Sequence, residues 1–153
     1  MGEVSPFRGR LPAMTASSIA LVREFQDAEA AEHQVTLETR HVLHGGLYAR
    51  TIRLPAGITI TGALIKIATL VIVDGDVIVW LGTESRRLTD YTVLPASAGR
   101  KQVFCALLET FITMIFPTEA QTVEEAERQF TDEAEILASR RKDADNTAVI
   151  TGE

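Results

Sequence analysis

Short apolar runs rich in β-branched and aromatic residues dominate the middle of the chain, residues 41–118. Gly, Pro and Asp separate these runs, which is the punctuation expected between short strands. Seven such runs occur, a count typical of a β-sandwich or β-barrel. They are Leu47–Leu54, Ile58–Ile60, Ile65–Val73, Val77–Leu81, Thr92–Leu94, Val103–Leu107 and Phe111–Phe116. The hydrophobic pattern therefore predicts a mainly β core.

Turn residues predict where the strands of this core reverse. Asp74-Gly75-Asp76 lies between two β-branched runs, and Asp-Gly in that setting predicts a tight hairpin whose central residues need positive φ. Pro55–Gly57 and Pro95–Gly99 mark two further corners, because proline fixes φ and glycine reaches conformations that other residues resist. The last strand is expected to end at Pro117.

After the core, residues 119–142 change to helical spacing. Thr122-Val123-Glu124-Glu125 is a capping box, in which the threonine and the last glutamate satisfy free backbone N–H groups at a helix start. Apolar residues then recur every three or four positions, and basic residues close the segment. This pattern predicts an amphipathic helix that runs to about Arg141. The mostly polar residues 143–153 predict a flexible tail that orders on a partner.

The first part of the chain, residues 1–40, predicts an arm and a short helix. Apolar residues at spacing three within Ser18–Glu32 favour a weakly amphipathic helix, and Met1–Thr15 is typical of an extended arm. The predicted organisation is therefore an arm and helix (1–40), a β core (41–118), a second helix (119–142) and a tail (143–153).

Composition and charge exclude several classes of function. The 153 residues are 46% hydrophobic, which fits one globular domain, and the net charge of −6 leaves no basic face for a nucleic-acid partner. The whole acidic excess lies in residues 119–153, with ten acids and four bases. No run supplies the roughly 20 apolar residues of a membrane helix, so no membrane partner is expected. A single cysteine, Cys105, and a charged start give no sign of secretion.

Several short sequence elements follow one another along the β core, and their order and spacing carry a family resemblance. They are His44–Ile52, Leu54–Gly57, Gly62, Leu70–Val73, Gly75-Asp76, Val93–Pro95, Gly99–Lys101 and Phe116–Thr118. Together with the Glu-rich segment that follows, this stretch resembles the small cupin-like proteins encoded among tailed-bacteriophage genes. The resemblance covers roughly residues 40 to 135. It implies a single jelly-roll β-barrel or sandwich with flanking helices, in agreement with the strand count.

The resemblance does not extend to the metal ligands that catalytic cupins use. Such enzymes hold a divalent metal through two His and a Glu in a first motif and a third His shortly after a Gly in a second motif. Between Ile58 and Val73 there is no His, Cys, Asp or Glu, and Ile65 and Thr69 stand where related phage sequences tend to carry His. Counting from Gly99 places Gln102 at the position of the third ligand. We therefore predict no metal, no cofactor and no catalytic residues.

The three histidines are the remaining candidates for a metal site. His33, His41 and His44 all precede the predicted core, and His41 and His44 share a spacing that suits a metal only on a helix. Gly45-Gly46 favours a turn there instead. We therefore interpret the pair as half-exposed residues at a strand entrance.

Other reactive residues also have simpler interpretations. Cys105 lies in an apolar run without a neighbouring base, which predicts a buried, unreactive thiol. Arg86-Arg87 is a candidate anion contact, although a solvated loop explains the pair as well. Asp74 and Asp76 lack the further ligands of a calcium loop.

Three aromatic residues bear on small-molecule binding. Trp80, Tyr48 and Phe104 are able to line a ligand cavity, because jelly-roll barrels have open mouths. Core packing is the favoured interpretation of all three. The low aromatic content, 6%, argues against a sugar- or base-stacking surface.

These observations lead to a structural hypothesis for the function. We expect a non-enzymatic phage virion protein, namely a capsid decoration or cement protein that binds the major capsid protein. It would be made in the host bacterial cytoplasm and would lie on the capsid exterior. A homo-oligomer, most simply a two-fold dimer, would suit an icosahedral shell. The alternatives are a metal-dependent cupin enzyme with ligands outside the usual motifs, a small-molecule-binding cupin module, a tail or baseplate component, and a nonstructural phage protein with a regulatory partner.

Overall fold

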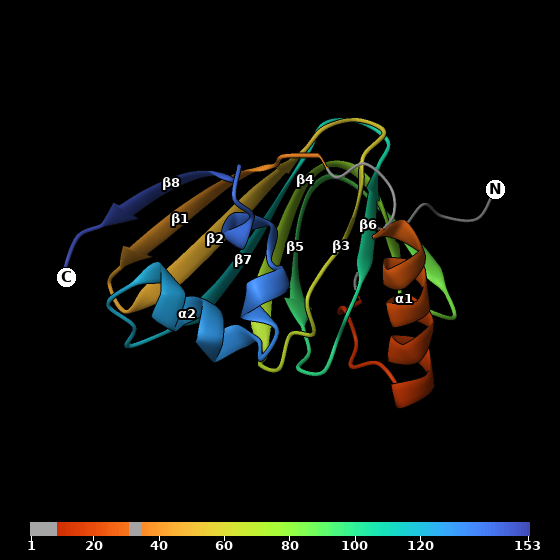
Figure 1. Cartoon of the computed structure of the whole chain (residues 1–153), viewed down its shortest axis with the longest axis horizontal. Coiled ribbons are helices and arrows are strands. Elements are labelled where there is room, and N and C mark those ends of the chain that lie inside the picture. Colours follow the sequence, from red (N-terminus) through yellow and green to blue (C-terminus); the bar gives the residue numbers. More distant parts are fainter. Residues whose placement is uncertain (1–8, 31–34) are drawn as a thin grey trace.

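The computed structural model describes residues 9–30 and 35–153. Within these residues the fold is mainly β, with eight strands in one curled sheet and a helix towards each end of the chain (Figure 1). The strands are β1 (Glu38–His44), β2 (Leu47–Leu54), β3 (Thr59–Thr61), β4 (Thr69–Trp80), β5 (Ser85–Ala96), β6 (Val103–Ala106), β7 (Thr110–Pro117) and β8 (Asp145–Ile150). The helices are α1 (Ala16–Glu29) and α2 (Val123–Phe130).

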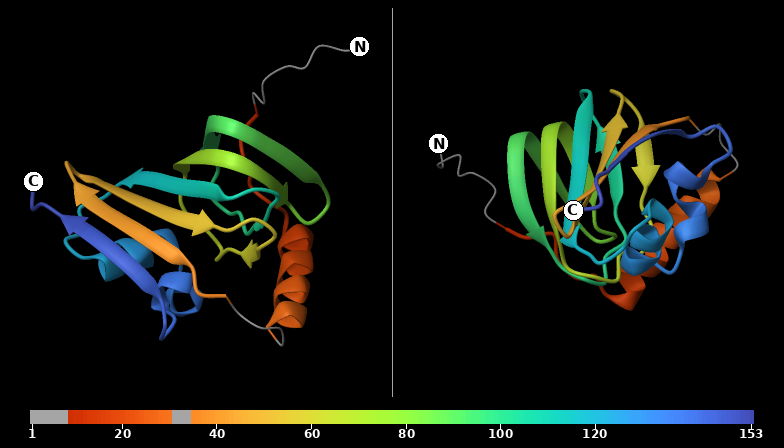
Figure 2. Two further views of the ribbon diagram at one scale, coloured as in Figure 1. Left: turned by 90° about the horizontal axis from the view of Figure 1, so that it is seen from above. Right: turned by 90° about the vertical axis from the view of Figure 1, so that its left-hand side faces the viewer.

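Strand β4 organises the sheet because it has partners along both edges. One edge pairs with β5 over its whole length, and the other pairs first with β7 and then with β6. The strand order β3-β6-β4-β7-β2-β1-β8 therefore diverges at β4, and the sheet curls into half a barrel (Figure 2). Both helices lie on the same side of this sheet. The expected fold class, a mainly β core in a curled sheet with flanking helices, is confirmed.

The predicted hairpin at Gly75 is wrong, because β4 runs straight through it. Every second side chain from Val71 to Val79 except Gly75 itself is buried, so the alternation continues across the glycine without a change of face. Gly75 has a φ of +148° and lies against the backbone of Thr110. The reversal occurs instead after Trp80, where the Leu81 amide donates to the Glu84 carbonyl at 2.8 Å.

The predicted C-terminal helix starts as expected but ends early. Thr122 caps α2 by accepting from the Glu125 amide at 3.2 Å, so the predicted cap is confirmed. The Glu125 carboxylate reaches back one residue further than a capping box requires and accepts from the Gln121 amide at 3.1 Å. The helix ends at Phe130 and does not continue to Arg141. Thr131 is extended and its hydroxyl accepts from the Glu133 amide, a local bond that competes with helix continuation. Two short 3-10 turns follow, η1 (Ala134–Ile136) and η2 (Ala138–Arg140).

The predicted flexible tail, residues 143–153, contains strand β8. This strand pairs in parallel with β1 in the register Glu38 to Asp145 through Leu43 to Ile150. Its side chains are exposed, which explains why the polar sequence gave no strand pattern. Backbone pairing to the open edge of β1 holds the segment in place.

At the other end, α1 begins with Thr15 as its cap and ends at Glu29, three residues before the predicted limit. Residues 1–8 of the predicted arm lie outside the described residues. The rest of that segment is not a free arm, because Leu11 bridges to Ala96 and is fully buried. No helix among the described residues is long and apolar enough to span a membrane.

Candidate functional site

The curled sheet encloses a cavity of about 120 Å³, which we call the inner cavity. Side chains from β2, β3, β4, β6 and β7 form its wall, and the end of α2 with η1 and η2 closes it. Hydrocarbon side chains make up most of this wall: Ile52, Ile60, Ala63, Ile65, Val71, Phe104, Ile112, Met114, Phe130, Ile136, Leu137 and Ala138. The cavity thus combines an apolar wall with few polar groups, which is the usual composition of a small-molecule site.

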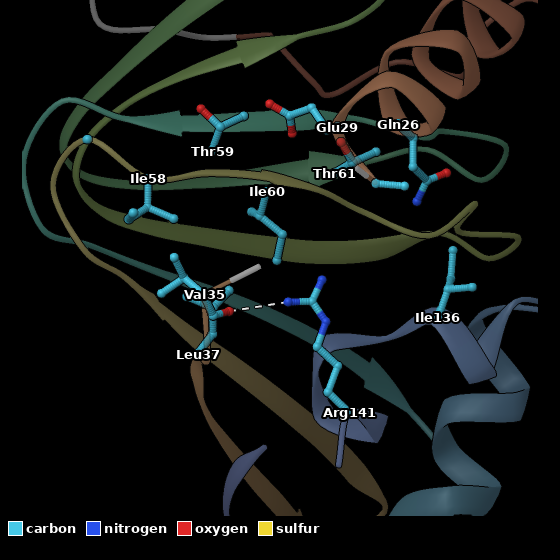
Figure 3. A pocket seen from close by; sticks show the side chains of 12 residues that line it. Gln26, Glu29, Val35, Leu37, Ile58, Thr59, Ile60, Thr61, Ile136 and Arg141 are labelled. Carbon is cyan, nitrogen blue, oxygen red and sulfur yellow. Dashed lines mark hydrogen bonds between the residues drawn. The ribbon is translucent and has the colours of Figure 1, made fainter. Parts of the chain in front are cut away.

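A larger cavity of about 490 Å³, the outer chamber, adjoins the inner cavity. The two share Ile60, Thr61, Ile136 and Arg141 as lining residues. Figure 3 shows the outer chamber between β3, the end of α1 and Arg141, whose guanidinium donates to the Val35 carbonyl at 3.2 Å. The inner cavity therefore lies directly behind the outer chamber.

Two buried polar atoms at the inner cavity have no hydrogen-bond partner within the described part of the chain. They are the amide nitrogen Nε2 of Gln102 and the hydroxyl Oγ1 of Thr61. Gln102 is only 4% exposed. A buried polar group left without a partner costs about 1–3 kcal/mol, and each such group in a native protein needs an explanation.

Arg100 places a buried positive charge at the same cavity. Arg100 is 3% exposed and forms no ion pair with the described carboxylates. Its Nη1 donates to the Ser97 carbonyl at 2.8 Å and to the Ile67 carbonyl at 3.4 Å, and its Nη2 donates to Thr69 Oγ1 at 2.8 Å and to Met114 Sδ at 3.8 Å. Burial lowers the pKa of Arg100 to about 10, so the guanidinium remains charged at neutral pH. Its hydrogen bonds fix the guanidinium between the start of β4 and the end of β5.

The charge around the inner cavity is positive. Arg50, Arg100 and Arg141 line it, and no Asp or Glu does so within the described residues. The charge of Arg50 is balanced from behind by Glu127, at 2.9 Å between Nη1 and Oε2. An acidic protein with a net charge of −6 thus encloses a cavity lined by cations.

A satisfied polar network supports the wall of the cavity behind Arg50. Glu127 is 1% exposed and accepts from Arg50, Ser139 and Arg140. Burial by itself raises the pKa of Glu127, but the hydrogen bonds from Ser139 and Arg140 and the charge of Arg50 outweigh it and lower the pKa. The network therefore ties β2, α2 and η2 together as a charged but fully paired unit.

His41 belongs to this supporting network and is buried, so its interpretation as half-exposed is wrong. It lies within β1, a strand that the sequence pattern did not reveal. Its Nδ1 lies 2.7 Å from the Tyr48 hydroxyl and its Nε2 lies 2.7 Å from Asn146 Oδ1. Burial lowers the pKa of His41 below its ordinary value, although the bond to Asn146 opposes the shift.

The remaining histidines do not join His41. His44 is exposed at the end of β1 and bonds to Thr151, and His33 lies outside the described residues. Within residues 9–30 and 35–153 no cluster of three His, Cys, Asp or Glu is placed to hold a metal. The inner cavity itself does not fit a divalent cation, because Arg100 and Gln102 present N–H donors where imidazole or carboxylate would be needed.

The other candidates from the sequence are scattered. Cys105 is partly buried in β6, whereas the sequence predicted a buried thiol. Arg87 pairs with Asp76 through both carboxylate oxygens, and Arg86 bonds to Glu84 and the Arg10 carbonyl. These pairs lie on the β4–β5 hairpin, and none of their residues lines the inner cavity.

The three aromatic candidates differ in whether they line the inner cavity. Tyr48 is fully buried against Phe116, so core packing is confirmed for it. Trp80 is partly buried and packs edge-on against Phe25 of α1. Phe104 lines the inner cavity. Of the cavity's polar residues, Gln102 was identified in the sequence as the residue at a metal-ligand position, and its neighbour Arg100 was missed although both follow Gly99.

Comparisons with known proteins give fold-level likeness only. No family model matches the chain. No curated protein matches it either. Similar solved structures include a cupin-2 domain protein from Shewanella frigidimarina, at 15% identity and a TM-score of 0.44, covering 65% of this chain and 97% of that one.

Two further solved structures are also similar to this chain. A cupin 2 conserved barrel domain protein from Leptotrichia buccalis is 11% identical with a TM-score of 0.47, covering 59% of this chain and 44% of that one. KdgF from Halomonas sp. is 21% identical with a TM-score of 0.41, covering 50% of this chain and 76% of that one. The likeness concerns the barrel and carries nothing about ligand or activity.

Proposed function

We propose that the protein is a cupin-like module that binds a small molecule in its inner cavity without catalysing a reaction on it. The cavity has the composition of a binding site, with an apolar wall and a few convergent polar groups. It adjoins the larger outer chamber, with which it shares four lining residues. The groups at the cavity position a ligand by hydrogen bonds and charge, and they include no nucleophile paired with a base.

The observation that carries this proposal is that two of the three unpartnered buried side-chain atoms among the described residues, Gln102 Nε2 and Thr61 Oγ1, belong to residues that line the inner cavity; the third is Thr39 Oγ1 in β1. Hydrogen bonds from a ligand to the two atoms at the cavity would offset the free energy that the empty protein loses by burying them. A ligand also explains why polar residues stand at positions where leucine or valine would stabilise the core.

A thermal-shift screen of small polar metabolites tests the proposal. We expect at least one to raise the Tm of the protein, because a ligand that binds only the folded state stabilises it. In the Ala63→Leu variant a larger apolar side chain fills the inner cavity, and the shift should disappear. Ala148→Leu on the exposed strand β8 is the matched control and should keep it. A shift that survives Ala63→Leu in a folded protein would place the ligand elsewhere and contradict the proposal.

A metal-dependent cupin enzyme receives no support from the donor set at the cavity. Elemental analysis of the purified protein separates the two readings. We expect no stoichiometric iron, manganese, nickel or zinc, and a stoichiometric metal would contradict a metal-free binding module.

A second candidate function is the capsid decoration role suggested by the resemblance to phage proteins. The observation that favours it is an apolar strip on the outer face of the β4–β5 pair. Leu70, Tyr91 and Val93 are 48%, 66% and 51% exposed, and Leu70 faces Pro95 across the pair. An exposed apolar strip on a long edge strand fits a protein partner, such as a major capsid protein or a second copy of the chain.

Mass spectrometry of purified virions tests this second candidate. A cement protein is expected at a copy number comparable to that of the major capsid protein. The Val93→Glu variant should reduce occupancy on the shell, whereas Thr89→Glu on the same strand should not. Absence of the wild-type protein from mature virions would exclude this role.

A further inference from the structure

The polar groups at the inner cavity share one chemical property: they offer hydrogen-bond donors. The Arg100 guanidinium has donors only, and the atom of Gln102 that lacks a partner is its amide nitrogen. The Thr61 hydroxyl donates or accepts as its partner requires. A group that pairs with all three must therefore accept hydrogen bonds.

The charge at the cavity narrows the class of acceptor. Arg100 is buried without a carboxylate partner within the described residues, and no acidic side chain among them lines the cavity. Protein acceptors bind both terminal nitrogens of Arg100 but leave its charge without a counter-ion, so an anion is the complementary ligand. A carboxylate offers two acceptor oxygens for the planar guanidinium and the neighbouring amide.

The size and the wall of the cavity narrow the class of ligand further. A volume of about 120 Å³ is the space of about four waters, or about four to six non-hydrogen atoms. Apart from the groups named above, Arg50 and Arg141, the wall is apolar, with isoleucines from β2, β3 and β7 and the rings of Phe104 and Phe130. Such a wall favours a short alkyl chain over a phosphate or a sugar, whose polar atoms would lose water without finding partners.

We propose that the inner cavity binds a short-chain monocarboxylate, with the carboxylate on Arg100, Gln102 and Thr61 and the alkyl chain against the isoleucine wall. This inference rests on the proposed binding function and names the ligand class. The ligand displaces no protein ion pair, because Arg50 keeps Glu127 as its partner behind the cavity wall.

Isothermal titration with butyrate, and with its neutral isostere butyramide, tests the ligand class. The wild-type protein is expected to bind butyrate at least tenfold more tightly than butyramide, because only the anion pairs with Arg100. Inorganic phosphate is the third probe and should not bind in the cavity.

Two variants locate the binding. Gln102→Leu keeps the size of the side chain and removes the donor, and it is expected to weaken butyrate binding about tenfold. Thr61→Val should weaken it several-fold, and Gln121→Leu, on an exposed segment, should leave it unchanged. Circular dichroism confirms that each variant is folded.

The failure of this inference differs from the failure of the proposed function. Equal affinity for butyrate and butyramide, or tight binding of a neutral metabolite that Ala63→Leu abolishes, would overturn the carboxylate assignment and leave a ligand site. Butyrate binding that survives Gln102→Leu and Thr61→Val unchanged would place the anion on surface arginines and overturn it as well. No binding of any probe or metabolite would overturn both.

Discussion

Single residues at the inner cavity that suit ligand binding lower the stability of the ligand-free protein. Gln102 is buried with an unpaired donor, and Arg100 is buried without a carboxylate partner within the described chain. Neither arrangement stabilises the empty protein. Residues that destabilise a core are expected where they bind a ligand. Their cost to the free energy of unfolding is measurable in the ligand-free protein.

The Gln102→Leu variant measures this cost. We expect the free energy of unfolding to rise by about 1 kcal/mol, because an unpaired buried amide is replaced by a hydrocarbon group of similar size. Urea unfolding in the absence of ligand provides the measurement, with Gln121→Leu as the exposed control. If the free energy of unfolding instead falls by more than about 1 kcal/mol, the amide has a protein partner and the expectation is contradicted.

The buried His41 predicts a pH dependence of stability. Burial lowers the pKa of His41 in the folded state, so the unfolded chain binds a proton more readily than the folded protein. A falling pH therefore lowers the free energy of unfolding. Stability should therefore be unaffected by this group above a pH of about 6.5 and fall below it, before the carboxylates titrate. Urea unfolding between about pH 7 and pH 5 tests this. The curve of His41→Gln should be flatter, and an equally steep curve would assign the effect elsewhere.

Gly75 is required where β4 meets the loop before β7. A Cβ at this position would lie 2.7 Å from the Glu109 carbonyl and also against Thr110 Oγ1, at a φ of +148°. We expect Gly75→Ala to cost about 3 kcal/mol through combined overlap and backbone strain. Gly57→Ala is the matched control, because its φ is also positive but nothing lies within 4 Å of the added Cβ. Its cost should be about 1 kcal/mol, and equal costs would contradict the role of the close contact.

At the scale of elements, the sequence predicted strands well where side chains alternate and poorly where the backbone alone decides. The run Leu47–Leu54 matches β2 in both bounds, and the cap at Thr122 is confirmed. Strand β8 has exposed side chains throughout and carries no such pattern. At Gly75 the Asp-Gly signal predicts a turn, but β4 continues through it with Val73 and Val77 both buried. The two apolar runs beside the glycine, Val71–Val73 and Val77–Val79, therefore belong to one strand.

Strand β8 is expected to protect the edge of β1. Its parallel pairing covers backbone groups from Glu38 to Leu43, and Asn146 bonds to His41. Deleting residues 145–153 should abolish hydrogen-exchange protection of amides in β1 that bond to β8, and should leave β4 protected, because β4 keeps its partners on both edges. Unchanged protection of β1 after the deletion would show that the segment does not pair there.

At the scale of the whole molecule, charge and fold combine in a way that sequence position does not reveal. The acidic excess lies in residues 119–153, whereas the arginines of the inner cavity come from three distant segments. Thr61, Arg100 and Gln102 meet only because β3 and the chain after β5 lie side by side, with Gly62 bonded to Gln102. The mainly β class was predictable from local pattern. The site was not, because it depends on long-range strand order.

Nuclear magnetic resonance of the Gln102 side-chain amide during a ligand titration tests the central claim most directly. If the inner cavity binds a small carboxylate, the Gln102 Nε2 resonances and those of Thr61 will shift saturably on addition of butyrate, and the side-chain amide of exposed Gln121 will not move. The Ala63→Leu variant will show no such shift. If the Gln102 resonances stay unchanged while only surface groups respond, the inner cavity is not a ligand site and the account is contradicted.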